Sequence, residues 1–379
     1  MLGTQRHMFD IPDDIAYFNC GYMSPLSKTV SAAGLAGVSR KSAPWEMTPA
    51  DFFTESDLVR NLFARLVGAS AKDIALIPSA SYGLAIAAKN IPLEKGQKIL
   101  VLEEQFPSNI YCWQERARTS GARIETVSMP DDRNWTRAVL RQIDSTVAVA
   151  ALPNNHWADG GLLDLVAIGK ALRSVGAKLV LDVTQSLGAL PLDVKDVQPD
   201  FLVVAAYKWL MGPYSTGMMY VALYHQQGKP VEYNWLNRAG SEDFSGLVNY
   251  QDSYQEGAVR FDMGERANFA LMPMVAAALE QLLDWGIENI YERLTATNTH
   301  IAESCAKFEL LSAPPELRAG HFLGLEKQGG FSPTLLKDLA AEKIYVSHRG
   351  NSLRITPNVY NTDADSDRLI DALARLTKD

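Results

Sequence analysis

The chain contains few cysteines, and their spacing shows no pattern that would bring them together. Cys20, Cys112 and Cys305 are the only cysteines among 379 residues, and no two of them form a CxxC pair. An odd number of widely spaced cysteines argues against a disulfide framework and excludes a cysteine-rich zinc site. The compartment that we expect from this pattern is a reducing cytoplasm.

Three further absences narrow the class of function. Basic residues are not in excess, since Asp and Glu outnumber Lys and Arg by 44 to 36, and this disfavours a general nucleic-acid-binding surface. The longest weakly polar stretch, residues 209–224, is short and is interrupted by Gly212, Pro213 and Gly217, and no apolar run typical of a signal peptide follows Met1. We therefore expect neither a nucleic-acid nor a membrane partner.

The residues that are present describe a globular α/β protein. Apolar residues make up 47% of the chain and charged residues 21%, and the length suggests two or three domains. Between about residues 70 and 225, short apolar runs alternate with amphipathic segments, which is the pattern of a mostly parallel sheet covered by helices. The expected strands are 74–78, 98–102, 123–127, 147–152, 178–181, 201–205 and 218–223, with helices at 81–90, 109–120 and 163–175.

The pattern changes after about residue 225. Residues 226–260 are polar and loop-like, and two long helices are predicted at 268–285 and 288–308. The tail favours a smaller α+β unit with strands at 321–325, 344–346 and 352–356 and helices at 333–341 and 363–376. We predict a large domain at 30–255 and a small C-terminal domain at 256–379, with residues 1–29 packing on one or both.

Asp182 and Lys208 are the first candidates for chemistry. Asp182 ends one apolar strand and Lys208 follows the next, so both are expected at the edge of the sheet where α/β proteins bind ligands. Apolar surroundings lower the pKa of a lysine, as a Schiff-base amine requires, and a carboxylate can keep a pyridine nitrogen protonated. Taken singly, Asp182 could cap a turn and Lys208 could extend from a strand end to solvent.

The segment that carries both residues reads LDVTQSLGALPLDVKDVQPDFLVVAAYKWLMGPYSTG over residues 181–217. It resembles the class V aminotransferase family of pyridoxal-phosphate (PLP) enzymes, and the resemblance extends over residues 17–362. It implies the PLP-dependent transferase fold (fold type I), a homodimer with active sites at the interface, and an internal aldimine on Lys208. By the same resemblance, Asp182 is the partner of the pyridine nitrogen and Gln185 hydrogen-bonds the phenolic oxygen of the ring.

The resemblance assigns further residues to the cofactor. Ser81 and Tyr82 lie at the start of a predicted helix and match the family's phosphate-binding turn, although a Ser at this position is a plain N-cap in most proteins. Tyr207 matches a phosphate-contacting Tyr of kynureninase-like members. Phe106 matches the aromatic residue that stacks on the pyridine ring, where cysteine desulfurases carry His; otherwise it is an ordinary buried Phe.

Other residues are assigned to the substrate side. His156 and Trp157 match an active-site loop, and Arg354 matches the second Arg of an RxGxxxRIxP-like motif that holds the substrate α-carboxylate. A lone His is more often structural than catalytic, so a structural role for His156 stays open as well. Glu265 replaces the Thr that reaches the phosphate across the dimer interface in the family, and Arg266 is an alternative source of that contact.

The cysteines also bear on the reaction. No cysteine lies between Phe308 and Arg354, where a desulfurase needs its nucleophile, and Cys305 falls inside a predicted helix, so persulfide chemistry is disfavoured. We expect a PLP-dependent enzyme that acts on an amino acid, of aminotransferase type on the kynureninase and isopenicillin-N-epimerase-like branch. An epimerase or a β/γ-lyase is the alternative. A catalytically silent PLP-fold protein is less favoured, and a nucleotide- or sugar-phosphate-binding enzyme is weak because GxGxxG and GxxxxGK[ST] are both missing.

Overall fold

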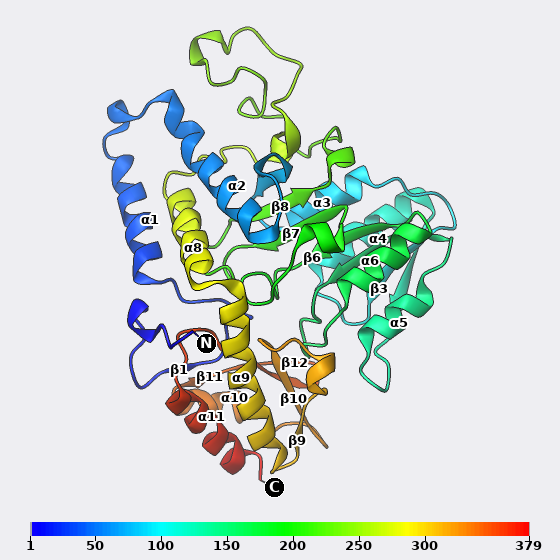
Figure 1. Cartoon of the computed structure of the whole chain (residues 1–379), viewed down its shortest axis with the longest axis vertical. Helices are drawn as coiled ribbons and strands as arrows, with labels where there is room; N and C mark the ends of the chain where they lie inside the picture. The colour runs from blue at the N-terminus through cyan, green and yellow to red at the C-terminus, as the bar shows by residue number, and fades with distance from the viewer. Residues whose placement is uncertain (1, 379) are drawn as a thin grey trace.

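The computed structural model describes residues 2–378 and is built around a seven-stranded sheet (Figure 1). Its strands are β2 (Ile74–Ile77), β3 (Lys98–Leu102), β4 (Arg123–Val127), β5 (Val147–Pro153), β6 (Lys178–Asp182), β7 (Phe201–Ala205) and β8 (Gly217–Val221). The strand order is β2-β8-β7-β6-β5-β3-β4, and only β8 runs antiparallel to its neighbours. The predicted mostly parallel sheet is confirmed, and each strand begins and ends within two residues of its expected position.

Helices cover both faces of this sheet because the side chains of each strand alternate between two apolar clusters. Ile99 and Val101 of β3 pack with residues of α3 and α4, whereas Leu100 and Leu102 pack with α2 and α5 to α8. These helices are α2 (Thr54–Val67), α3 (Ala80–Asn90), α4 (Ser108–Ser120), α5 (Trp135–Gln142), α6 (Leu165–Ser174), α7 (Val194–Val197) and α8 (Leu271–Trp285). Burial on both faces explains why the strands read as continuous apolar runs.

Helix α1 (Lys28–Arg40) lies against α8 through glycines rather than large apolar side chains. A Cβ atom at Gly37 would lie 2.1 Å from the carbonyl oxygen of Phe269, and one at Gly34 would lie 2.6 Å from the sulfur of Met274. The two helices can therefore approach closely only because these positions lack a side chain. Ser27 starts α1 by accepting a hydrogen bond from the N–H of Val30.

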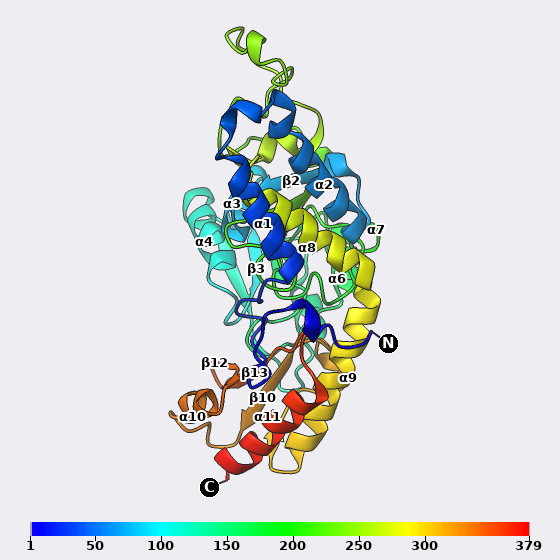
Figure 2. The same ribbon diagram turned by 90° about the vertical axis from the view of Figure 1, so that its left-hand side faces the viewer.

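The C-terminal part forms a second, smaller unit (Figure 2). An antiparallel sheet of order β12-β13-β10-β9 and a two-stranded β1-β11 pair are covered by three helices. The elements are β1 (Ala16–Tyr17), β9 (Leu310–Leu311), β10 (Leu323–Lys327), β11 (Ile344–Tyr345), β12 (Ser347–Arg349), β13 (Ser352–Ile355), α9 (Ile287–Ala306), α10 (Leu335–Ala341) and α11 (Asp363–Leu376). Short 3-10 helices occupy Arg6–Met8, Pro44–Glu46, Pro49–Phe52, Ala71–Asp73, Leu223–His225, Phe244–Gly246, Gly257–Phe261 and Pro315–Leu317.

The N-terminal segment lies at the junction of the two units (Figure 2). Its N–H groups bond to both: Cys20 donates to the carbonyl of Thr356 and Ser24 donates to the carbonyl of Tyr207. The expected division at residue 256 does not coincide with a break in the packing, because α8 lies on α1 and α2 and the long helix α9 continues into the small unit. Across residues 2–378, no helix combines the length and the apolarity that crossing a bilayer requires.

Candidate active site

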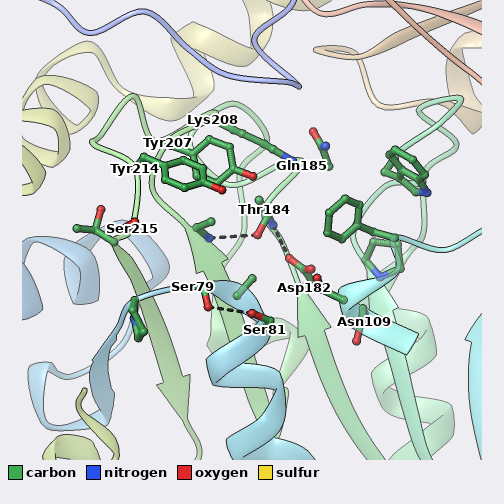
Figure 3. A pocket seen from close by; sticks show the side chains of 18 of the residues that line it. Ser79, Ser81, Asn109, Asp182, Thr184, Gln185, Tyr207, Lys208, Tyr214 and Ser215 are labelled. Atoms are coloured by element: carbon green, nitrogen blue, oxygen red, sulfur yellow. Dashed lines mark hydrogen bonds between the residues drawn. The ribbon is translucent and has the colours of Figure 1, made fainter. Parts of the chain in front are cut away.

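A cavity of about 240 Å³ lies at the carboxyl ends of the central strands (Figure 3). Strand β3 lies between β4 and β5, so the chain adds β4 on one side of β3 and β5 on the other. Such a switch point opens a crevice above the sheet in which α/β proteins bind ligands. The segments after β2, β3, β5, β6 and β7 all contribute residues to this cavity.

Lys208 reaches the cavity from the turn that follows β7 (Figure 3). Its side chain is buried, and its Nζ lies 5.4 Å from the ring centre of Phe106 and 5.5 Å from that of Tyr207. Burial lowers the pKa of Lys208 to about 8, with Asp182 opposing this shift and Arg354 adding to it. The amine therefore exchanges its proton close to neutral pH, as a lysine that acts as a nucleophile and a base requires.

Asp182 stands at the last position of β6 and faces the same cavity. Its Oδ1 accepts a hydrogen bond of 3.0 Å from the N–H of Thr184, and its pKa is raised, mainly by burial. Among the described residues no cation lies within 4 Å of this carboxylate. A buried carboxylate is stabilised as an anion by a positively charged hydrogen-bond donor, and a protonated pyridine nitrogen is such a donor.

Gln185 is fixed by its neighbours on both sides of its amide. Its Nε2 donates to the carbonyl of Gly21 at 3.0 Å, and its Oε1 accepts from Nε1 of Trp209 at 3.3 Å. Trp209 in turn packs edge-on against His321, whose Nε2 lies 2.8 Å from the carbonyl oxygen of Gln185. Because Trp209 follows Lys208 directly and is fully buried, this packing also fixes the turn that carries the lysine.

The N-terminus of α3 closes the cavity opposite Gln185 (Figure 3). Ser79 caps the helix by accepting from the N–H of Tyr82 at 3.2 Å, and its hydroxyl lies 2.9 Å from that of Ser81. Ala80, Ser81 and Thr216 also line this end. Hydroxyl groups together with the first N–H groups of a helix suit an anion such as a phosphate.

Aromatic side chains form the walls. Phe106 contacts Trp157 edge-on at 5.4 Å between ring centres, and Tyr207 contacts Tyr214 at 4.7 Å. The Nε1 of Trp157 donates to the carbonyl of Glu104 at 2.6 Å, which fixes its ring. A flat ring bound over Asp182 would therefore be enclosed by other flat rings.

An adjoining cavity opens from Lys208 towards the small unit, so it has the position of a substrate site. Arg354 of β13 lies there, 2% exposed, with its guanidinium carbon 5.6 Å from the ring centre of Trp157. Its Nε donates to Oγ of Ser347 and its Nη1 donates to the carbonyl of Trp157. Tyr22 and Arg349 line the same cavity.

The structure does not bring His156 and Tyr82 to the cavity. His156 is 1% exposed, stacks on Trp135, and its two ring nitrogens lie 3.1 Å from Oδ1 of Asp159 and from the carbonyl oxygen of Glu103. The expected place of His156 on the substrate side is therefore not found. The side chain of Tyr82 packs against the apolar cluster under α3, and only its N–H faces the helix start.

Arg266 is likewise committed elsewhere. It is 1% exposed, donates to Oδ1 of Asn237, and lies 3.2 Å from Oδ2 of Asp262. Asp262 is also paired with Arg60. In this buried network Arg266 cannot reach a phosphate of a second subunit, whereas Glu265 is exposed at the neighbouring position.

Several residues that line the site were not assigned from the sequence. Thr184, Asn109 and Tyr214 line the first cavity, and Tyr22 and Arg349 line the second. Thr184, Tyr214 and Arg349 lie inside the motifs that carried the resemblance, so their position in those motifs could have indicated a place in the site. Tyr22 had no such signal, because only the folded N-terminal segment brings it to Lys208.

Comparisons with known proteins agree with this geometry. The Aminotransferase class-V family matches residues 47–363. An uncharacterized aminotransferase, YcbU, of Bacillus subtilis is 25% identical over 85% of this chain and 84% of its own, and the kynureninase of Bacillus cereus is 25% identical over 91% and 82%.

A solved structure of a mutant of C-DES, a cystine C–S lyase, with glycine covalently linked to its PLP cofactor superimposes with a TM-score of 0.87 at 18% identity and covers 98% of this chain and 99% of that one. At that identity the likeness shows the fold alone, which is the PLP-dependent transferase fold expected from the sequence. Together with the family match, these findings show that the chain belongs to the class V aminotransferase family of PLP-dependent enzymes.

Proposed function

We propose that this enzyme acts on an α-amino carboxylate through a Schiff base on Lys208, and that it is of aminotransferase type. The observation that carries the proposal is the position of Lys208 between two groups of opposite charge. Asp182 lies on the cofactor side of the amine and Arg354 on the other, and one continuous region joins them.

The residues of the first cavity fit the cofactor. Asp182 would hold the protonated pyridine nitrogen, Phe106 would stack on the ring, and Gln185 would face its phenolic oxygen with the second hydrogen of its amide. Ser79 and Ser81 would bind the phosphate at the start of α3. Each assignment uses a group that lines the cavity and whose chemistry matches the part of PLP that it would contact.

The residues around Lys208 divide the work of the reaction. Bound PLP supplies an electron sink for negative charge that develops at the α-carbon of the amino acid. Arg354 binds the α-carboxylate and so orients the bond to be broken. Lys208, with a pKa of about 8, would take the proton from the α-carbon and return it, and Asp182 would be the partner that favours a protonated pyridine nitrogen.

The scarcity of bases favours transamination over epimerisation. Among the described residues that line the two cavities, Lys208 is the only lysine or histidine. The tyrosines Tyr22, Tyr207 and Tyr214 line them too, and burial raises the pKa of Tyr207 to about 12. A single base can move a proton between two carbons on one face of the ring, whereas inversion requires a proton from the opposite face. The resemblance to kynureninases keeps lyase chemistry as the alternative.

Sulfur transfer is disfavoured by the state of the cysteines. Cys20, Cys112 and Cys305 are unpaired, and burial raises the pKa of each thiol to about 12. A thiol with so high a pKa is a poor nucleophile at neutral pH. We propose a reducing compartment such as the cytoplasm from the small, odd number and wide spacing of the cysteines.

The test is a spectrum followed by product analysis. Protein loaded with PLP is expected to absorb visible light, to change its spectrum with an α-amino acid, and to form a 2-oxo acid and a new amino acid when an acceptor 2-oxo acid is present. Lys208→Ala is expected to abolish turnover, whereas Lys195→Ala, outside both cavities, is expected to retain it. An amino acid of inverted configuration would establish an epimerase, and a released fragment of the side chain would establish a lyase. Bound PLP with no turnover would establish a catalytically silent protein.

A further inference from the structure

Two arginines without carboxylate partners face the cavity beyond Lys208. Arg349 and Arg354 both line it, with their guanidinium carbons 6.0 Å and 5.6 Å from the centre of the same Trp157 ring. Among residues 2–378, no Asp or Glu oxygen lies within 4 Å of either guanidinium. The pKa of Arg354 is lowered to about 10, mainly by burial and further by the charge of Arg349, so the two cations repel each other across the cavity.

The hydrogen bonds of the two arginines leave donors free. Arg349 uses Nη1 for the carbonyl of His348, and Arg354 uses Nε for Ser347 and Nη1 for the carbonyl of Trp157. No hydrogen bond among the described residues engages the Nη2 of either side chain. Two guanidinium groups with unused donors in one half-buried cavity favour a ligand with two anionic groups.

The acidic residues nearby do not neutralise Arg349, although several line the next cavity beside it. Asp159 accepts from Gly161 and lies against His156, Glu326 pairs with Arg133, and Glu103 accepts from the N–H of Met129.

Glu104 is the remaining acid of that cavity, and its Oε2 lies near Gly350, 3.4 Å from where a Cβ at that glycine would stand. Glu104 does not line the cavity beyond Lys208, and among residues 2–378 no ion pair joins it to Arg349.

We propose, resting on the function proposed above, that the preferred substrate is an amino acid with a carboxylate on its side chain, which Arg349 binds while Arg354 holds the α-carboxylate. Lys208 borders the same cavity as the two arginines, so the α-amino group of such a substrate is expected on the side of Lys208. Trp157 lies beside both guanidinium groups and forms the apolar wall along the carbon chain of the substrate. Arg349 is accordingly a specificity residue and takes no part in proton transfer.

The experiment compares acids with their amides, which match them in size but lack the second charge. Enzyme loaded with PLP is titrated with L-aspartate, L-asparagine, L-glutamate, L-glutamine and L-alanine, and the change in the cofactor spectrum gives a dissociation constant for each. Wild type is expected to bind one of the two acids about 10- to 100-fold more tightly than its amide, the range of one charge-assisted hydrogen-bonded pair.

Arg349→Gln is expected to remove this preference while binding the amide as wild type does, and Arg349→Lys is expected to restore part of it. Arg133→Gln, a neighbouring arginine that lines only the next cavity, is the control and is expected to keep the preference. Equal binding of acid and amide by wild type would overturn the inference, and so would an equal loss for both in Arg349→Gln. If no amino acid, charged or neutral, changes the spectrum of bound PLP, the function proposed above fails instead.

Discussion

The pKa of Lys208 is set by effects of opposite sign, and their balance decides how much of the amine is neutral. Burial removes water from the ammonium group and lowers its pKa, and the positive charges of Arg354 and Arg349 act in the same direction. The negative charge of Asp182 works against them. The resulting value of about 8 leaves about one-tenth of the amine neutral at pH 7, because the neutral share falls tenfold for each pH unit below the pKa.

This balance predicts how the rate of cofactor uptake depends on pH. Only the neutral amine attacks the aldehyde of PLP, so the rate with cofactor-free protein is expected to rise through pH 8 and then to level off. With an ordinary lysine the rate would keep rising towards that group's usual pKa of 10.5. Stopped-flow absorbance between pH 6 and pH 10 measures the midpoint.

Asp182→Asn provides the matched comparison. Removing the negative charge is expected to move the midpoint to lower pH, since Asp182 raises the pKa of Lys208. The titration of PLP itself is common to both proteins, so the difference between them reports the lysine. An unchanged midpoint would contradict the proposed coupling between the two residues.

The sequence placed most site residues because their motifs lie at strand ends, where the fold leaves little choice. Lys208, Asp182, Gln185, Phe106, Tyr207, Ser81, Trp157 and Arg354 all border the two cavities, although their roles stay predictions. His156 could not be placed correctly from sequence, because its ring is turned away by Asp159, Glu103 and Trp135. Glu103 and Asp159 lie in the turns after β3 and β5 and Trp135 lies in α5, and no local sequence pattern predicts that they meet around His156.

At the scale of elements, the start of α3 has two functions that a substitution can separate. Ser79 accepts the N–H of Tyr82 and also lines the phosphate end of the cavity. Ser79→Ala is expected to lower the free energy of unfolding of the cofactor-free protein by about 1 kcal/mol, the usual cost of a lost N-cap. It is also expected to weaken binding of PLP but not of pyridoxal, which lacks the phosphate.

Asp164→Ala is the control for this prediction. Asp164 caps α6 by accepting from the N–H of Ala167 and does not line the cavity. A similar loss of stability without a change in PLP affinity is expected from it, by urea unfolding and cofactor titration respectively. If Ser79→Ala weakened PLP and pyridoxal equally, the serine would act only through the fold.

The strands could be predicted from the sequence, whereas α1 could not, because its packing does not follow the usual apolar pattern. A strand buried on both faces must be apolar throughout, so β3, β5, β6 and β7 stand out in the sequence. Helix α1 buries Val30, Gly34 and Gly37 and exposes larger apolar side chains, which reverses the expected pattern of a surface helix. Only the position of α8 explains the glycines, and that position is a long-range property.

At the scale of the whole molecule, the outward face of α1 exposes apolar side chains and is a candidate interface. Leu35 is 71% exposed and Val38 is 60% exposed, and Trp45 beyond the helix is 80% exposed. Apolar side chains that gather on one face of a helix mark an interaction surface more often than those scattered singly. Ser81, at the phosphate end of the cavity, is also exposed.

We therefore predict a homodimer that depends on α1. Sedimentation at micromolar concentration is expected to give twice the chain mass for wild type and the chain mass for Leu35→Glu combined with Val38→Glu, because two buried charges cannot be paired across a symmetric apolar contact. Leu223→Glu, at an apolar residue 78% exposed outside α1, is the control and is expected to remain dimeric. A wild-type protein that sediments as a monomer, or a double variant that stays dimeric, would show that the apolar face of α1 has another role.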